Sequence, residues 1–395
     1  MKAGAPLFAS FAKGGHDDSC RAILTFLECH AKDSILPALE SKAWATRQVK
    51  GCIAERAMDI FRSAAWSDRL LPLNIILTIT LPHLALAEVQ GKELPMAPVV
   101  YRTVVYRSIQ IDGLSIFYRE AGAKNAETLL LLHGLPSSSR MFEPLFARLS
   151  DRYHLIAPDY PGFGHSDWPD PKKFAYTFDR CAEIINHFTE ALGISRYTLY
   201  MQDYGGPVGF RMILAHPERV EALIVQDAVA HNEGLGANWK TRRAFWADRA
   251  ANESALRTNL LSLEAARARH VGNDPDVERH NPDLWTDEFY FLNRPGQAEI
   301  QSDLFYDYRT NVESYPKWQT WMRERQPRLL VIWGKYEVSF DASEPESYRK
   351  DVPNAEVHVV DGGHFALDTA GDEIAALVKG FMVSSHSDLK ARRVG

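Results

Sequence analysis

The chain has 395 residues, of which 46% are hydrophobic and 24% charged, and its formal net charge is −6. This is enough apolar material to bury an α/β core and an additional helical segment. The negative charge offers no basic field for nucleic acid, so we expect no nucleic-acid partner. Walker and dinucleotide-binding glycine motifs are absent, and the histidines lack metal-ligand spacing. We therefore expect no cofactor and no metal.

The N-terminal segment allows two interpretations. From Met58 the sequence is apolar, is interrupted by Pro72 and Pro82, and ends in Ala85-Leu-Ala87. This pattern is typical of a secretory signal with an Ala-x-Ala cleavage site, and it is too interrupted for a stable membrane span. A signal peptide over 58–87 would make the protein periplasmic or secreted and leave 1–57 outside the mature chain. The alternative is a small helical extension on a cytoplasmic protein.

Beyond this segment, short apolar runs alternate with helical patterns. Such alternation predicts a mostly parallel sheet flanked by helices, with a first core part over 88–230 and a second over 326–395. The predicted strands end in polar or glycine-containing turns, where functional side chains of parallel sheets gather. They cover 117–122, 128–134, 153–159, 197–200, 220–227, 328–334 and 355–361.

Asp203 occupies a strand–turn–helix junction. It follows the predicted strand that starts at Tyr197 and precedes Tyr204-Gly-Gly206, after which Pro207 suits the first turn of a helix. Glycines allow the close backbone approach of such a turn, and the helix N-terminus favours an anion. An N-cap aspartate ending a buried strand would have the same local pattern.

From Tyr106 to Met382 the ordered motifs resemble the α/β-hydrolase family. The branch they resemble contains the epoxide hydrolases and haloalkane dehalogenases, which use an aspartate nucleophile. The resemblance makes Asp203 the nucleophile and His364, in Asp361-Gly-Gly-His364, the general base. It also makes the backbone N–H groups of Tyr204 and of Leu135, after His133-Gly134, the oxyanion hole.

Two carboxylates compete for the role of triad acid. Glu337, in Trp333-Gly-Lys-Tyr-Glu337, stands where the family has Trp-Gly-x-x-Asp, with glutamate in place of aspartate. Asp227 ends the predicted strand over 220–227, where some branches of the family place the acid. We favour Glu337 because its motif is fuller, and the other carboxylate would then support the site from behind.

Between the two core parts, residues 231–325 lose the strand alternation and resemble the inserted helical cap of this branch. Tyr308, in Leu304-Phe-Tyr-Asp-Tyr308, matches the tyrosine that polarises an epoxide oxygen, although it would also suit a packing role. A second lid donor is not clearly marked. Tyr290 and Trp246 are the candidates for further substrate contacts in the cap, and His133 is a further substrate-binding candidate beside Leu135 and Tyr204.

The resemblance implies that the enzyme opens small or medium apolar epoxides to diols through an ester on Asp203, with a small molecule and water as its only partners. A haloalkane dehalogenase with the same triad and a non-catalytic ligand-binding relative are the alternatives. Tyr204 and Leu135 stand where dehalogenases carry halide-binding Trp or Asn side chains, so a halide would be left to cap tryptophans such as Trp239. No arginine follows Asp203 immediately, which argues against a carboxylate-bearing haloacid. The oligomeric state stays open.

Overall fold

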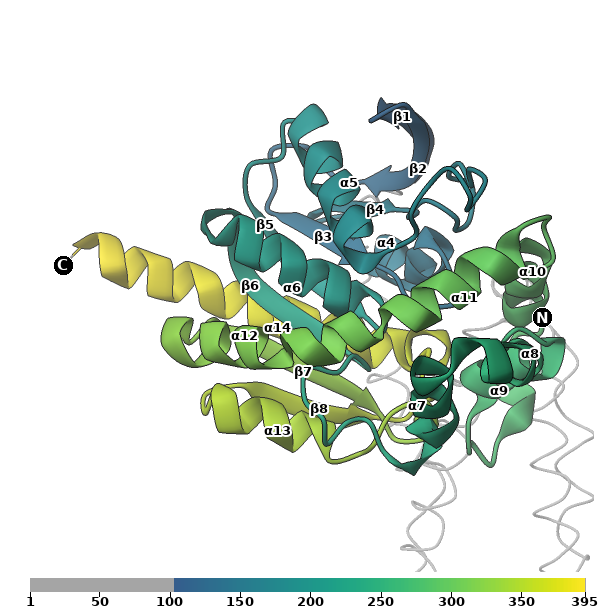
Figure 1. Cartoon of the computed structure of the whole chain (residues 1–395). Coiled ribbons are helices and arrows are strands. Elements are labelled where there is room, and N and C mark those ends of the chain that lie inside the picture. The colour runs from purple at the N-terminus through teal and green to yellow at the C-terminus, as the bar shows by residue number, and fades with distance from the viewer. Residues whose placement is uncertain (1–102, 395) are drawn as a thin grey trace, which may run out of the picture. The chain divides into compact units, whose positions relative to one another are not determined.

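The structure is a computed structural model that describes residues 103–394, with side chains described as far as Val383 (Figure 1). The expected extension over 1–57 and the expected signal peptide over 58–87 lie outside the described residues. No helix in the described part of the chain is long and apolar enough to cross a membrane.

An eight-stranded sheet forms the centre of the described region, in the order β1-β2-β4-β3-β5-β6-β7-β8. The pairs β1–β2 and β2–β4 are antiparallel, and the pairs from β4 onward are parallel, which confirms the mostly parallel sheet. The strands are β1 (Val105–Ile111), β2 (Leu114–Ala121), β3 (Thr128–Leu132), β4 (His154–Pro158), β5 (Tyr197–Gln202), β6 (Val220–Gln226), β7 (Leu329–Gly334) and β8 (Glu356–Val360).

The central strands are buried on both faces, which explains their unbroken apolar runs. In β3, Leu130 and Leu132 belong to one core cluster, while Leu129 and Leu131 belong to the other. This is the two-residue period of a strand. The first cluster includes side chains of α5 (Phe178–Ala191), α6 (Gly205–Ala215) and α13 (Glu344–Asp351), and the second includes α4 (Glu143–Leu149) and α14 (Leu367–Val394).

Six helices lie between β6 and β7, in the region where the sequence predicts a cap. Figure 1 shows α7 to α10 gathered beside one end of the sheet, with α11 running back along it towards α12. Ser262 and Asp248 cap two of the helices by accepting backbone N–H groups. The helices are α7 (Lys240–Ala247), α8 (Arg249–Leu260), α9 (Leu263–Val271), α10 (Asp283–Leu292), α11 (Gln297–Asp307) and α12 (Arg309–Arg325).

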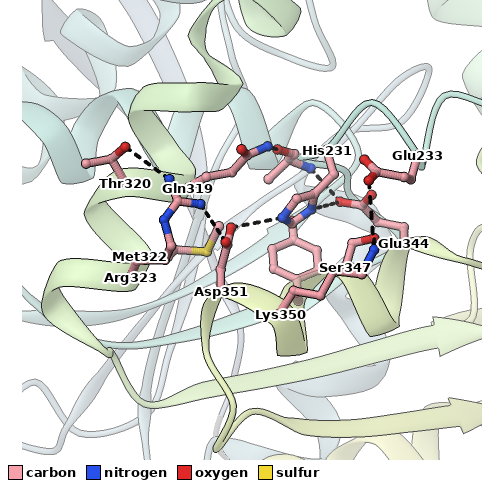
Figure 2. A network of polar contacts seen from close by, with 12 residues as sticks. His231, Glu233, Gln319, Thr320, Met322, Arg323, Glu344, Ser347, Lys350 and Asp351 are labelled. Atoms are coloured by element: carbon pink, nitrogen blue, oxygen red, sulfur yellow. Dashed lines mark hydrogen bonds and ion pairs between the residues drawn. The ribbon is translucent and has the colours of Figure 1, made fainter.

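A polar network fastens the beginning and the end of this insertion to the core (Figure 2). His231, just after β6, lies between Glu344 and Asp351 of α13, with N···O distances of 2.9 and 3.0 Å. Arg323 of α12 donates to the same Asp351 at 2.7 Å. Burial opposes a charge on His231, but the hydrogen bonds to Glu344 and Asp351 outweigh it and raise the pKa of the imidazole. The chain therefore leaves and re-enters the core at a shared ionic cluster.

Candidate active site

Asp203 sits at the turn between β5 and α6 in a left-handed backbone conformation, with φ of 46°. Non-glycine residues rarely adopt this conformation, and where they do the surrounding structure imposes it. The turn is tight because α6 passes close to β3. A Cβ added at Gly205 would lie 2.1 Å from the carbonyl oxygen of Leu132, so only glycine fits there. Packing of the helix on the strand thus fixes where the Asp203 carboxylate projects.

The Asp203 carboxylate is held by two backbone donors. Leu135 N–H donates to Oδ1 at 2.8 Å, and Tyr204 N–H also hydrogen-bonds the carboxylate. Asp203 is 7% exposed, and burial raises its pKa, while His364 and the two N–H groups act in the opposite direction. Asp203 Oδ1 thus lies at one of the two expected oxyanion-hole donors, the Leu135 N–H.

His364 lies between Asp203 and Glu337. Its Nε2 is 3.7 Å from Asp203 Oδ2, and its Nδ1 is 2.5 Å from Glu337 Oε2. Burial lowers the pKa of His364, but Glu337 and then Asp203 outweigh it and raise the pKa to about 9. The Gln202 side-chain amide donates to the carbonyl oxygen of His364 at 3.2 Å, and the same nitrogen is 3.2 Å from Nε2. That contact suits the neutral tautomer with its proton on Nδ1, which is the form a general base needs.

Of the two competing carboxylates, the structure brings Glu337 to the imidazole. The other oxygen of Glu337 accepts the backbone N–H groups of Ser339 and Phe340, which pins the side chain within its own loop. Asp227 instead accepts the N–H of Gly334 at 2.8 Å and contacts the Gln226 amide at 3.3 Å. Burial, and then the charge of Glu337, raises the pKa of Asp227 well above its usual value. Asp227 thus supports the turn that leads to Glu337.

His133 is fully buried and both of its ring nitrogens face backbone groups. Nδ1 lies 3.1 Å from the carbonyl of Gly134, and Nε2 accepts the N–H of Tyr160 at 3.3 Å. Burial lowers the pKa of His133 to about 4, so the ring is neutral. It shapes the loop that presents Leu135 N–H, and it has no free polar atom for a substrate.

The cap places a group of aromatic side chains near the turn between β5 and α6 that carries Asp203, which we call the elbow. The ring of Tyr308 lies 6.0 Å from that of Tyr204 and 4.7 Å from that of Trp239, and it stacks on Trp246 at 6.2 Å. Burial, and then the neighbouring Tyr315 with which it forms a side-chain hydrogen bond, raises the pKa of Tyr308 well above its usual value, so the hydroxyl keeps its proton. The indole N–H of Trp246 donates to the carbonyl of Phe305 at 2.7 Å, so Trp246 contributes its ring face.

Tyr290 is not brought to this group. Its side chain is 67% exposed, and it packs on Phe291 and Arg294 at the surface of the cap. The helical pattern around it predicts that α10 forms, but not which face of α10 turns inward. Sequence reasoning also missed Gln202, Arg242 and Arg269, whereas it named Trp239 as a cap tryptophan that could hold a halide. Only Gln202, next to the nucleophile, carries a local signal in the sequence.

Among the described residues, no group of three or more His, Cys, Asp or Glu side chains is arranged to hold a metal ion. Arg211, which follows Asp203 in α6, donates to Asn311 at 2.7 Å and to Thr310 at 3.0 Å. Arg211 therefore ties α12 to α6 and does not serve the site.

The alpha/beta hydrolase fold family model matches residues 127–370. A hydrolase of Saccharomyces cerevisiae, itself uncharacterised, is 37% identical over 269 residues, which cover 67% of this chain and 92% of that protein. Haloalkane dehalogenase 2 of Mycobacterium bovis is 28% identical over 280 residues, covering 63% of this chain and 86% of the relative. A cis-3-alkyl-4-alkyloxetan-2-one decarboxylase of Xanthomonas campestris is 25% identical over 297 residues, covering 68% and 93%.

Solved structures share the same architecture. The epoxide hydrolase CorEH superposes with a TM-score of 0.54 at 18% identity, covering 71% of this chain and 99% of its own. The haloalkane dehalogenase DbeA of Bradyrhizobium elkani gives a TM-score of 0.58 at 19% identity, covering 71% and 100%. At these identities the likeness establishes the fold and leaves the substrate to the residues of the site.

Proposed function

The chain belongs to the α/β-hydrolase family, and from this premise we propose that it opens epoxides to diols through an alkyl ester on Asp203. The observation that carries the proposal is the arrangement at Asp203. Its Oδ1 accepts the Leu135 N–H at 2.8 Å, and its Oδ2 faces His364 at 3.7 Å, backed by Glu337. Oδ1 is therefore held by a backbone N–H group, and Oδ2 is the oxygen that would attack a substrate carbon.

A carboxylate at the elbow suits attack on a saturated carbon. Oδ2 displaces the epoxide oxygen directly, because no proton has to leave the nucleophile first. The Tyr308 hydroxyl donates its proton to the oxygen as the ring opens. Water then attacks Cγ of the ester while His364 removes its proton, and the N–H groups of Leu135 and Tyr204 hold the developing oxyanion. Collapse of this intermediate passes the proton from His364 to the departing alkoxide and releases the diol. The proton left on the Asp203 carboxyl then restores the Tyr308 hydroxyl, so Asp203 returns as a carboxylate.

The same residues would also support displacement of a halide, and this is the second candidate. The dehalogenase relative favours it, whereas the buried Tyr308 hydroxyl favours a leaving oxygen that needs a proton. The relative named as an oxetan-2-one decarboxylase acts on another strained oxygen ring, so such rings belong in the substrate panel. A non-catalytic role is disfavoured because nucleophile, base and oxyanion donors are all present.

The test is a single turnover with excess enzyme in ¹⁸O-water, using a panel of epoxides, bromoalkanes and oxetan-2-ones. The first product should be free of label at the attacked carbon, and the label should appear in the peptide that contains Asp203. His364→Gln should accumulate the ester, seen as one added substrate mass on that peptide. Label arriving directly in the first product would mean that water attacks the substrate, which would contradict the ester mechanism.

Turnover of the panel also separates the candidates. Tyr308→Phe should slow ester formation from an epoxide by about 10²-fold, the usual contribution of one positioned proton donor. It should change the reaction with a bromoalkane far less, because bromide leaves without a proton. Equal losses on both substrate classes would remove Tyr308 from the role of donor.

A further inference from the structure

Two arginines of the cap carry positive charge towards the nucleophile. Arg242 of α7 and Arg269 of α9 both interact electrostatically with Asp203 and with Tyr204, the residue after it. Arg242 lies on the face of Trp239, with its guanidinium carbon 4.6 Å from the ring centroid. Because Trp239 in turn contacts Tyr308, Arg242 belongs to the aromatic group above the elbow.

Arg269 is anchored beside the catalytic histidine. A Cβ placed on Gly363 would lie 3.7 Å from the carbonyl oxygen of Arg269, so α9 packs directly on the turn before His364. The neighbouring ring of His270 stacks on Phe365, with centroids 4.4 Å apart. Helix α9 thus holds the backbone of Arg269 beside the turn that leads to His364.

The Arg269 guanidinium is only partly satisfied. The side chain is 7% exposed, and its Nη2 donates to the carbonyl of Leu260 at 2.9 Å. Its Nη1 is buried and has no hydrogen-bond partner among the residues that the structure describes. The same holds for the hydroxyl of Tyr204. Buried donors without acceptors are costly, and both residues interact electrostatically with Asp203, so a ligand bound there could satisfy them with acceptor oxygens.

Neighbouring acids do not fill this need. Glu288 also acts on Arg269, but one of its oxygens lies 2.9 Å from Nε2 of His270, with which it forms a buried ion pair. Asp203 is the other anion that acts on Arg269, and it becomes a neutral ester once the substrate is attached. At that point the Arg269 guanidinium lies near a nucleophile that has lost its charge. A negative group on the substrate would restore the balance.

We propose that Arg269 and Arg242 form a carboxylate subsite, and that the substrate is an epoxide or halide bearing a carboxylate near the reacting carbon. This rests on the proposed function, whose site it completes. A guanidinium fork matches the planar carboxylate better than it matches a spherical halide. The carboxylate would then orient the reacting carbon towards Asp203 Oδ2. Sequence reasoning argued against such substrates because no arginine follows Asp203, but the cap supplies the cations instead.

Binding of an inert pair of ligands tests the subsite without turnover. Calorimetry of the wild type should find that hexanoate binds at least about tenfold more tightly than hexanamide, which has the same shape without the charge. Arg269→Met and Arg242→Met should each reduce that preference, and Arg269→Lys should keep part of it. Arg257→Met is the matched control, because Arg257 is a cap arginine already paired with Glu253 and Glu299, and it should keep the full preference.

The reactive pair is 2,3-epoxyhexanoate and 2,3-epoxyhexanamide. The wild-type ratio of kcat/KM, acid over amide, should exceed about ten and should fall at least tenfold in Arg269→Met, because each loss of a charged partner is worth about that much. If both epoxides react but neither arginine affects the ratio, the subsite is wrong and the proposed function stands. If no epoxide or halide reacts but hexanoate binding depends on Arg269, the proposed function fails and the subsite stands. Equal binding of acid and amide by the wild type would overturn the subsite.

Discussion

The Asp227 carboxylate accepts the backbone N–H of Gly334 at 2.8 Å, across the ends of the adjacent strands β6 and β7. Asp227 lies where some branches of the family place the triad acid, and Gly334 belongs to the motif that leads to Glu337. The contact makes one of the two carboxylates a support for the loop that carries the other, Glu337. The two roles should therefore separate when each side chain is changed.

Glu337→Gln should lower the rate of ester hydrolysis by about 10²- to 10⁴-fold, because the amide neither fixes the Nδ1–H tautomer of His364 nor balances the imidazolium. Asp227→Asn should cost less than about tenfold, since the amide oxygen still accepts the Gly334 N–H. Rapid-quench measurement of ester formation and decay separates the two steps. The opposite ranking would transfer the role of triad acid to Asp227.

The two chemical steps should depend differently on pH. In the free enzyme, Glu337 and Asp203 hold the pKa of His364 at about 9. Ester formation neutralises Asp203, so the pKa of His364 should fall below that value in the intermediate. Hydrolysis needs neutral His364 and should rise with pH up to the lowered pKa, then level off. Ester formation needs only ionised Asp203 and should not follow this curve. Matching pH profiles for the two steps in rapid-quench experiments would contradict these assignments.

Gly205→Ala should destabilise the fold by more than about 3 kcal/mol, because its Cβ would meet the Leu132 carbonyl oxygen at 2.1 Å and strand and helix cannot both stay in place. Gly380→Ala is the matched control. It adds a Cβ to an exposed position of α14 with no atom within 4 Å, and it should stabilise by about 0.5–1 kcal/mol. Urea unfolding of both variants measures the difference. A Gly205→Ala protein of wild-type stability would show that the elbow is less tightly packed.

His270 links the cap to the core between Asp368, at 2.6 Å, and Glu288, at 2.9 Å. Burial opposes its charge, but Glu288 and then Asp368 outweigh it and raise the pKa to about 10. A pKa above the unfolded value of 6.5 means that the stabilisation is complete below pH 6.5 and is lost as the pH rises towards 10. His270→Gln should flatten the decline of unfolding free energy between about pH 7 and 10, whereas His187→Gln, at a more exposed position, should not. Equal slopes in wild type and His270→Gln would rule out this contribution.

The sequence predicts the sheet and the residues at its strand ends, because those positions follow from local pattern. Asp203 and Glu337 follow the buried strands β5 and β7, His364 follows the edge strand β8, and parallel strands bring such ends together without further information. The cap is different. Whether Tyr290 or Arg269 turns inward depends on how short helices pack on the core, and their spacing does not encode that rotation. The sequence therefore predicts the residues at the strand ends better than it predicts which cap side chains contact a substrate.

Helix α9 contacts both catalytic loops, and this limits how the site can open. A Cβ on Gly272, at the end of α9, would lie 2.2 Å from the Tyr336 carbonyl, in the loop of Glu337, and Arg269 packs beside Gly363, in the loop of His364. If α9 moved away with the rest of the cap, the loops of Glu337 and His364 would lose the helix that packs on them. A route to Asp203 that leaves both loops in place would have to leave α9 in place as well. Helix α9 therefore belongs to the cap and at the same time supports the loops that carry Glu337 and His364.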